Sequence, residues 1–228
     1  MKEWLGDWGL ARGIERHNFL IRRIARKHAE GLVYRGRVLD LGCGKAPYKD
    51  IIMEMADEYI GVDWENVRDR SRVDVFSDLS KPLPFDNDFA DTIVSFEVLE
   101  HLPEPDNFLS ECHRVLRPGG YLLMTAPFIW HVHEEPYDYY RFTKYGLEYL
   151  LRKNRFSEVS IEEKTGAWLM LALMFNYHTT SLARGPIKYI LYLIWWCTQV
   201  FGFLMDKVNP GYGRTVLYTI QARKDQIA

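Results

Sequence analysis

The sequence has few cysteines, little net charge, no internal repeat and no low-complexity tract. Its three cysteines, Cys43, Cys112 and Cys197, are an odd number without paired spacing, which argues against a disulfide framework and favours a reducing compartment. The formal net charge of −2 creates no field that would attract nucleic acid, so we expect no nucleic-acid partner. The N-terminal residues contain no continuous apolar segment, which predicts no signal peptide and a cytoplasmic location.

A glycine is also missing where a dinucleotide-binding turn would need it. Residues 38–44, Val-Leu-Asp-Leu-Gly-Cys-Gly, are a short apolar run ending in two glycines, which predicts a buried parallel strand that opens into a turn beside a ligand. A helical pattern follows over residues 48–56. Pro47 replaces the third glycine of the dinucleotide fingerprint, and Asp40 would repel a phosphate. An NAD-linked oxidoreductase is therefore a poor fit, whereas a cationic or amino-bearing ligand suits the acid.

A second acid follows at a spacing that points to a ribose. The short apolar strand predicted over residues 58–63 ends in Asp63, roughly twenty residues beyond Asp40. An acid at this place commonly binds both ribose hydroxyls, because two carboxylate oxygens match a vicinal diol. Trp64 beside it is expected to lie on the adenine face.

Residues 37–127 resemble the class I S-adenosyl-L-methionine (SAM)-dependent methyltransferases in the order and spacing of four motifs. Besides the glycine turn, the resemblance is carried by Leu-Pro-Phe and an acidic turn before the strand at 92–96, Glu-Val-Leu-Glu-His-Leu at 97–102, and Arg-Val-Leu-Arg-Pro-Gly-Gly-Tyr-Leu at 114–122. The last two motifs are similar to those of the ubiquinone and menaquinone branch. The resemblance implies SAM as cofactor and an α/β fold: a Rossmann-like, seven-stranded, mostly parallel sheet with helices on both faces and a reversed last strand.

The resemblance also implies which residues hold the cofactor. An acid after the third strand accepts a hydrogen bond from the adenine amino group; Asp78, followed by Leu79, fits this role, and Asp74 is an alternative. The complete expected set is Asp40, Gly42, Cys43, Gly44, Asp63, Trp64, Asp78, Leu79, Phe96 and Glu97.

The chain departs from this family between its last two predicted strands, at about 156–164 and 214–223. A long segment with two apolar stretches, 167–175 and 187–205, stands where a short hairpin is usual, which predicts a helical insert before the last strand. A single membrane span would separate two strands of one sheet, so we expect the insert to lie in a membrane interface, to form a substrate tunnel, or to form a homodimer face. Simple packing on the domain is the remaining alternative.

The whole chain is predicted to be a single methyltransferase domain with four parts. Residues 1–35 form an N-terminal helical lid, 36–165 the SAM-binding core, 166–212 the hydrophobic insert and 213–228 the last strand and tail. The basic amphipathic pattern at 10–30 also fits a helix that packs on the flank of the sheet, or a patch for anionic lipid or nucleic acid.

The segment after the fifth strand, residues 131–142, concentrates imidazole, carboxylate, phenol and guanidinium groups above the expected ligand edge. A hydroxyl acceptor must lose its proton as it attacks the methyl group, and His133 is the predicted general base, with His131 as the alternative. Predicted substrate-contacting residues are His131, Glu134, Tyr137, Tyr139 and Arg141.

A metal ion is a competing interpretation of the same region. Glu97, Glu100 and His101 stand three and four residues apart, and His131 or His133 would complete a ligand set. This turn resembles the metal-binding turn of some quinone-precursor and small-RNA O-methyltransferases, although the same letters occur in metal-free relatives. The sequence leaves the metal undecided.

The sequence therefore predicts a SAM-dependent methyltransferase that O-methylates a hydroxyl on a glycan, a lipid-linked sugar or a quinone-like lipid. Its expected partners are that small-molecule, glycan or lipid-linked substrate and, peripherally, the inner face of a membrane. The alternative is a non-catalytic SAM-binding or membrane-docking protein with the same fold.

Overall fold

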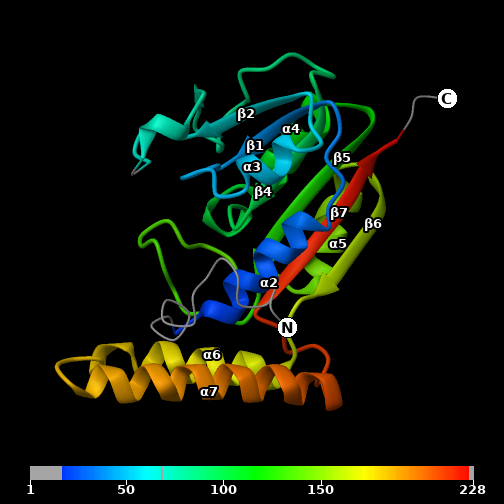
Figure 1. Ribbon diagram of the computed structural model, residues 1–228. Helices are drawn as coiled ribbons and strands as arrows, with labels where there is room; N and C mark the ends of the chain where they lie inside the picture. Colours follow the sequence, from blue (N-terminus) through cyan, green and yellow to red (C-terminus); the bar gives the residue numbers. More distant parts are fainter. Residues whose placement is uncertain (1–16, 68, 226–228) are drawn as a thin grey trace. The chain divides into compact units, whose positions relative to one another are not determined.

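The computed structural model describes residues 17–67 and 69–225, and its centre is one seven-stranded sheet (Figure 1). The strand order is β3-β2-β1-β4-β5-β7-β6. Strands β1 to β5 pair in parallel, and β7 runs antiparallel to β5. The order reverses between β1 and β4, and in open α/β sheets a ligand crevice lies beyond the carboxyl ends of the strands at such a point.

The predicted elements are found with shifted ends. The strands are β1 (Arg37–Leu41), β2 (Glu58–Asp63), β3 (Val75–Phe76), β4 (Ala90–Phe96), β5 (Leu116–Pro127), β6 (Phe156–Glu163) and β7 (Leu217–Lys224). The α-helices are α2 (Phe19–Glu30), α3 (Lys49–Met53), α4 (Pro105–Val115), α5 (Lys144–Lys153), α6 (Ala167–His178) and α7 (Ile187–Val208). Short 3₁₀ turns are η1 (Arg70–Arg72), η2 (Leu99–His101) and η3 (Thr180–Leu182). The predicted fold class is thereby confirmed, and the helix predicted over 48–56 after the glycine turn is shorter in the structure.

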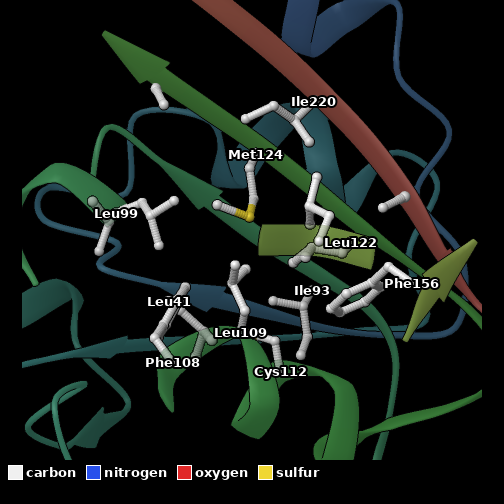
Figure 2. Packing of buried hydrophobic residues seen from close by; sticks show 14 of the residues in the cluster. Leu41, Ile93, Leu99, Phe108, Leu109, Cys112, Leu122, Met124, Phe156 and Ile220 are labelled. Carbon is white, nitrogen blue, oxygen red and sulfur yellow. The ribbon is translucent and has the colours of Figure 1, made fainter. Parts of the chain in front are cut away.

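Alternating side chains of the central strands enter two separate cores, as the two-residue period of a strand requires. Leu39 of β1 and Leu122 of β5 lie in the larger core, against α4 and α5, whereas Val38 and Leu123 lie in a second core with α3 (Figure 2 shows the larger core). Helices therefore cover both faces of the sheet, and β1 is buried along nearly its whole length.

The described chain divides into two compact units. One contains residues 29–162 and 217–225 and holds the whole sheet apart from the last residue of β6; the other contains residues 17–28 and 163–216. The insert predicted at 166–212 is the helix pair α6 and α7, joined by η3. The predicted lid at 1–35 falls partly on residues 1–16, which lie outside the described residues. Its described part is α2, which begins in the insert's unit and ends in the sheet's unit.

Candidate functional site

The glycine turn after β1 is held by the neighbouring strand and leaves an open front. The backbone N–H groups of Gly42 and Cys43 donate to the carbonyl oxygen of Val62 at 2.8 and 3.1 Å. Gly42 has φ +81°, and a Cβ there would lie 2.3 Å from a methyl carbon of Val98, so only glycine fits. Gly44 also has a positive φ, +54°, but a Cβ there would meet nothing within 4 Å. The backbone at Gly44 thus faces free space where a ligand can approach closely.

Asp63 lies beside this open front, as the spacing predicted. One carboxylate oxygen of Asp63 accepts from the backbone N–H of Gly44 at 2.7 Å, and the other accepts from Trp64 N–H at 2.8 Å. These bonds join the end of β2 to the glycine turn. Trp64 is 40% exposed, and its ring makes an edge contact with Tyr137, with centroids 5.2 Å apart.

The carboxyl group of Asp40 is engaged within the protein. Asp40 is buried and accepts from the Tyr59 hydroxyl at 2.7 Å. Burial raises its pKa to about 6, and the hydrogen bond from Tyr59 opposes that shift. Asp40 supports the strand end beneath the turn, and its predicted contact with a cofactor amino group stays a prediction.

The two acids considered for the adenine contact have different local roles. Asp74 accepts from the backbone N–H of Gly61 at 2.8 Å and so braces β2. Asp78 caps the following turn by accepting from Ser80 N–H at 3.0 Å, which is the main reason why its pKa is lowered, and it pairs with Lys81 at 3.3 Å. The next predicted residue, Leu79, is buried in the larger core.

Strand β4 ends in the last two predicted cofactor residues. Phe96 packs edge-on against Tyr48, with centroids 5.3 Å apart. Glu97 has φ +57°, a left-handed conformation that costs energy for a non-glycine residue, and its N–H donates to the Thr125 hydroxyl at 3.1 Å. Desolvation by the surrounding protein raises the pKa of the Glu97 carboxyl to about 7, and the hydrogen bond with Thr125 opposes this shift.

Turn η2 buries an acid without a hydrogen-bonding partner. The side chain of Glu100 is fully buried, and neither of its carboxylate oxygens has a hydrogen-bond partner. Burial, reinforced by the charge of Glu97, raises its pKa well above the usual value. The Nε2 atom of His101 lies 3.6 Å from a Glu100 oxygen, and burial lowers the pKa of His101. A buried group of this kind is costly, so it marks a place where a proton, an ion or a ligand belongs.

Asp138 organises the segment after β5. Its carboxylate forms two 2.6 Å contacts with the Arg141 guanidinium, accepts from the backbone N–H of His133 at 2.8 Å and lies 3.3 Å from Nδ1 of the same residue. Arg141 is the main cause that lowers the pKa of Asp138 to about 2. The segment is fixed to η2 as well, because the N–H groups of Tyr139 and Tyr140 donate to the backbone carbonyl of Glu100.

These contacts favour one tautomer for each of two facing histidines. Nδ1 of His101 lies 2.8 Å from the carbonyl oxygen of Tyr137, and Nδ1 of His133 lies near both Asp138 and the carbonyl oxygen of His131. Arg141 approaches the same nitrogen of His133 at 3.3 Å, but two acceptors outweigh one donor. Nδ1 therefore carries the proton in both rings, whose centroids are 4.9 Å apart, and each Nε2 keeps a lone pair.

Part of the metal-ligand set proposed from the sequence is close enough together to hold an ion. Single ligand atoms of Glu100, His101 and His133 lie within 4.8 Å of one another, whereas Glu97 and His131 are outside this group. One buried carboxylate and two imidazole nitrogens are donors that Zn²⁺, Mn²⁺ or Fe²⁺ accepts.

The structure brings together most of the predicted substrate residues and one that the sequence analysis did not select. His131, Tyr137, Tyr139 and Arg141 share the segment, with Glu134 exposed at its bend. Asp138 was not chosen, although its place five residues after His133 and three before Arg141 was visible. Only the folded loop shows that this carboxylate reaches both.

The comparisons with known proteins agree with the fold described above. Residues 39–124 match the family model described as "Methyltransferase domain". The chain is 39% identical over 119 residues to a probable S-adenosylmethionine-dependent methyltransferase of Mycolicibacterium smegmatis, which covers 49% of this chain and 44% of the relative. It is 24% identical over 165 residues to the ubiquinone biosynthesis O-methyltransferase of Pseudomonas aeruginosa, covering 70% of this chain and 64% of that protein.

Among solved structures, a SAM-dependent methyltransferase from Archaeoglobus fulgidus has the same fold, with a TM-score of 0.58 and 20% identity. The match covers 92% of this chain and 95% of that one. The chain spans less than half the length of the mycobacterial relatives that it matches.

Proposed function

Because this chain carries a class I SAM-dependent methyltransferase domain, we propose that it transfers the methyl group of SAM to a hydroxyl oxygen. The observation that carries the proposal is the His133–Asp138 pair, which supplies an oriented general base in a segment whose Tyr137 ring contacts Trp64, next to Asp63. The ubiquinone biosynthesis O-methyltransferases among its relatives support an oxygen acceptor. Bound SAM would supply an electrophilic methyl group on a sulfonium.

The protein's own part in this reaction is alignment and proton removal. An attacking hydroxyl gives its proton to Nε2 of His133 while its oxygen forms the bond to the methyl carbon. The methyl–sulfur bond breaks in the same step, which leaves a neutral thioether. Asp138 holds the ring of His133 in the tautomer that this step needs and stabilises the imidazolium that results. Glu97 and Arg141, whose charges interact, would help to orient the acceptor.

The acceptor that we propose is a glycan, a lipid-linked sugar or a quinone-like lipid. Support comes from the aromatic rings of Trp64, Tyr137 and Tyr139, which stay 40 to 46% exposed beside the base. Flat sugar faces and quinone rings both stack on such surfaces. We place the protein in the cytoplasm, where SAM is made available to it. The three cysteines of the sequence are all free, as is usual in a reducing compartment.

The experiment is methyl transfer from labelled SAM to the membrane and soluble fractions of the source cell, incubated separately. We expect labelled product in one of the fractions, and we expect the variant His133→Ala to lose about 10²–10⁴-fold in turnover. The matched control is His178→Ala, an exposed histidine at the end of α6. Calorimetry on the same preparations separates the alternative: SAM binding without transfer to any fraction would indicate a non-catalytic SAM-binding protein.

A metal-assisted reaction is the second candidate, and the buried, unpartnered carboxylate of Glu100 favours it. Glu100, His101 and His133 would hold the ion, which would lower the pKa of a bound acceptor hydroxyl. The two candidates exclude each other in one respect, because Nε2 of His133 cannot bind a metal ion and accept a proton at once.

A further inference from the structure

The helix pair α6–α7 exposes one continuous apolar face. Along α7 the exposed apolar side chains recur every three or four residues, which places them on one side of the helix. They are Ile190, Leu193, Ile194, Phe201, Leu204 and Val208. On α6 the equivalent side chains are Trp168, Leu171 and Phe175, and the rings of Trp168 and Phe201 meet at 6.1 Å between centroids. The two stripes therefore join into a single surface, called here the α6–α7 face.

The inside of the pair holds two polar amides among its buried apolar side chains. Asn176 and Gln199 are fully buried, and both amides donate to the carbonyl oxygen of Trp195, at 3.1 and 2.9 Å. Trp195 is itself buried, and its indole N–H donates to the Thr179 hydroxyl at 2.8 Å. A helix pair in water normally hides its apolar side chains and exposes its amides. Here two amides are buried while large apolar side chains stay outside, which fits a pair whose outer face meets hydrocarbon.

The chain enters α6 and leaves α7 at the same end of the helix pair. The carboxylate of Asp206, near the end of α7, accepts from the backbone N–H groups of Gly166 and Trp168 at the start of α6, at 2.8 and 2.9 Å. The helices therefore run antiparallel, side by side (Figure 1). Helix α7 is long and apolar enough to cross a membrane, but α6 has only 12 residues, about 18 Å, against a hydrocarbon core of about 30 Å. A hairpin of these lengths lies in the membrane surface and does not span it.

The charges of this segment favour an anionic surface. Residues 167–212 contain three basic side chains, Arg184, Lys188 and Lys207, and a single acid, Asp206. The charge of Asp206 is used at the N-terminus of α6, where backbone N–H groups neutralise it. Arg184 precedes α7 and Lys188 begins it, and the exposed Tyr189 stands beside them. Basic and aromatic side chains at the edge of an apolar face are typical of a contact with anionic lipid headgroups.

We propose that the α6–α7 face docks this protein, lying in the plane of the surface, on a bilayer that contains anionic phospholipid. The two tryptophans of α7 are not the anchors, because Trp195 points into the pair and Trp196 is half-buried. The residues that enter the lipid are those of the α6–α7 face, with Trp168 at the level of the headgroups.

The test is flotation of the full chain with phosphatidylcholine vesicles prepared with and without phosphatidylglycerol. We expect the wild type to float with the anionic vesicles. The partition coefficient of Leu193→Glu/Phe201→Glu onto these vesicles should be lower by about tenfold or more. Arg184→Gln/Lys188→Gln should lose roughly fivefold per residue on anionic vesicles and keep its weak binding to neutral ones. The matched control is Tyr145→Glu/Tyr149→Glu, which alters two aromatic side chains on α5 that are at least as exposed.

Two results would overturn the proposal. The first is a wild type that stays at the bottom of the gradient with both kinds of vesicle. The second is a wild type that is dimeric by light scattering while Leu193→Glu/Phe201→Glu is a folded monomer, since the face would then be the homodimer interface. Circular dichroism of each variant shows that loss of flotation is not loss of folding, and none of these residues lies in the proposed site for methyl transfer.

Discussion

The carboxylate of Asp138 holds His133 at two points, the backbone N–H at 2.8 Å and the ring Nδ1 at 3.3 Å. The same carboxylate is clamped by Arg141, and its side chain is only 2% exposed. A buried acid that fixes both the backbone and the ring of one histidine determines which ring nitrogen can accept a proton.

Asp138→Asn tests that role. An asparagine can keep the size but offers an N–H group to Nδ1, so we expect turnover to fall about 10²-fold or more while SAM affinity changes little. The measurement is the pH profile of kcat alongside calorimetric titration with SAM. A merely structural role would lower both together, whereas Glu135→Gln, on an exposed residue of the same segment, should leave the profile as it is.

The same acid should make stability depend on pH at the acidic end. The folded pKa of Asp138 is lowered to about 2 from an unfolded value near 3.8, chiefly by Arg141, so its contribution is complete above about pH 4 and disappears as the pH falls to 2. Thermal melts over this range should show Asp138→Asn losing less stability on acidification than the wild type. Parallel curves would contradict the assignment.

Glu100→Gln should have the opposite pH signature. Because burial raises the folded pKa of Glu100 above its unfolded value, the stability it contributes is complete below about pH 4.5 and declines as the pH rises. The neutral amide removes that penalty, so the gain in Tm should grow between pH 5 and pH 8. An excess of Mn²⁺ or Zn²⁺ should raise the Tm of the wild type if the metal candidate is right, and EDTA should reverse the effect.

The variants separate the two uses of this cluster. If Glu100→Gln and His101→Ala abolish the metal-induced shift, the ion binds where the three ligand atoms meet. A shift that persists in both variants places the ion elsewhere. Activity that ignores EDTA while His133→Ala is inactive supports the general base.

Asp63→Ala should weaken SAM binding by roughly 2–3 kcal/mol, because a charge-assisted contact with the ribose diol is lost. The structure adds a reason, since Asp63 also orders the N–H of Gly44. Asp74→Ala is a useful comparison, because that acid braces β2 through Gly61. Unchanged affinity in a folded Asp63→Ala protein would remove Asp63 from the cofactor site.

The two glycines of the turn should fail in different ways. Gly42→Ala combines a left-handed backbone with a clash against Val98, so we expect unfolding free energy to drop by roughly 2–4 kcal/mol. Gly44→Ala has no such clash; its methyl group enters the open front, so it should lower SAM affinity more than stability. Denaturant titration and calorimetry on the pair distinguish the two effects, and equal losses of stability would contradict this division.

The sequence alone determined which segments form strands and where the glycine turn and Asp63 meet. Asp63 and the glycine turn follow directly from strand ends, and parallel strands bring their carboxyl ends to one edge, so a spacing along the chain predicts a place in space. The resemblance to class I methyltransferases implied the sheet and its covering helices, and the two apolar stretches predicted the insert before β7.

Only the tertiary structure decided which polar groups meet. Asp138 became important through contacts across a loop, whose path no periodicity describes. Glu100 is one of two similar acids in its motif, and the turn at η2 buries it while it leaves Glu97 open to water. On α7 every apolar residue looks alike in sequence, and only the partner helix decides that Trp195 turns inward with Gln199 while Leu193 and Phe201 remain outside. Burial is a property of the assembled pair, and for that reason composition could not assign it.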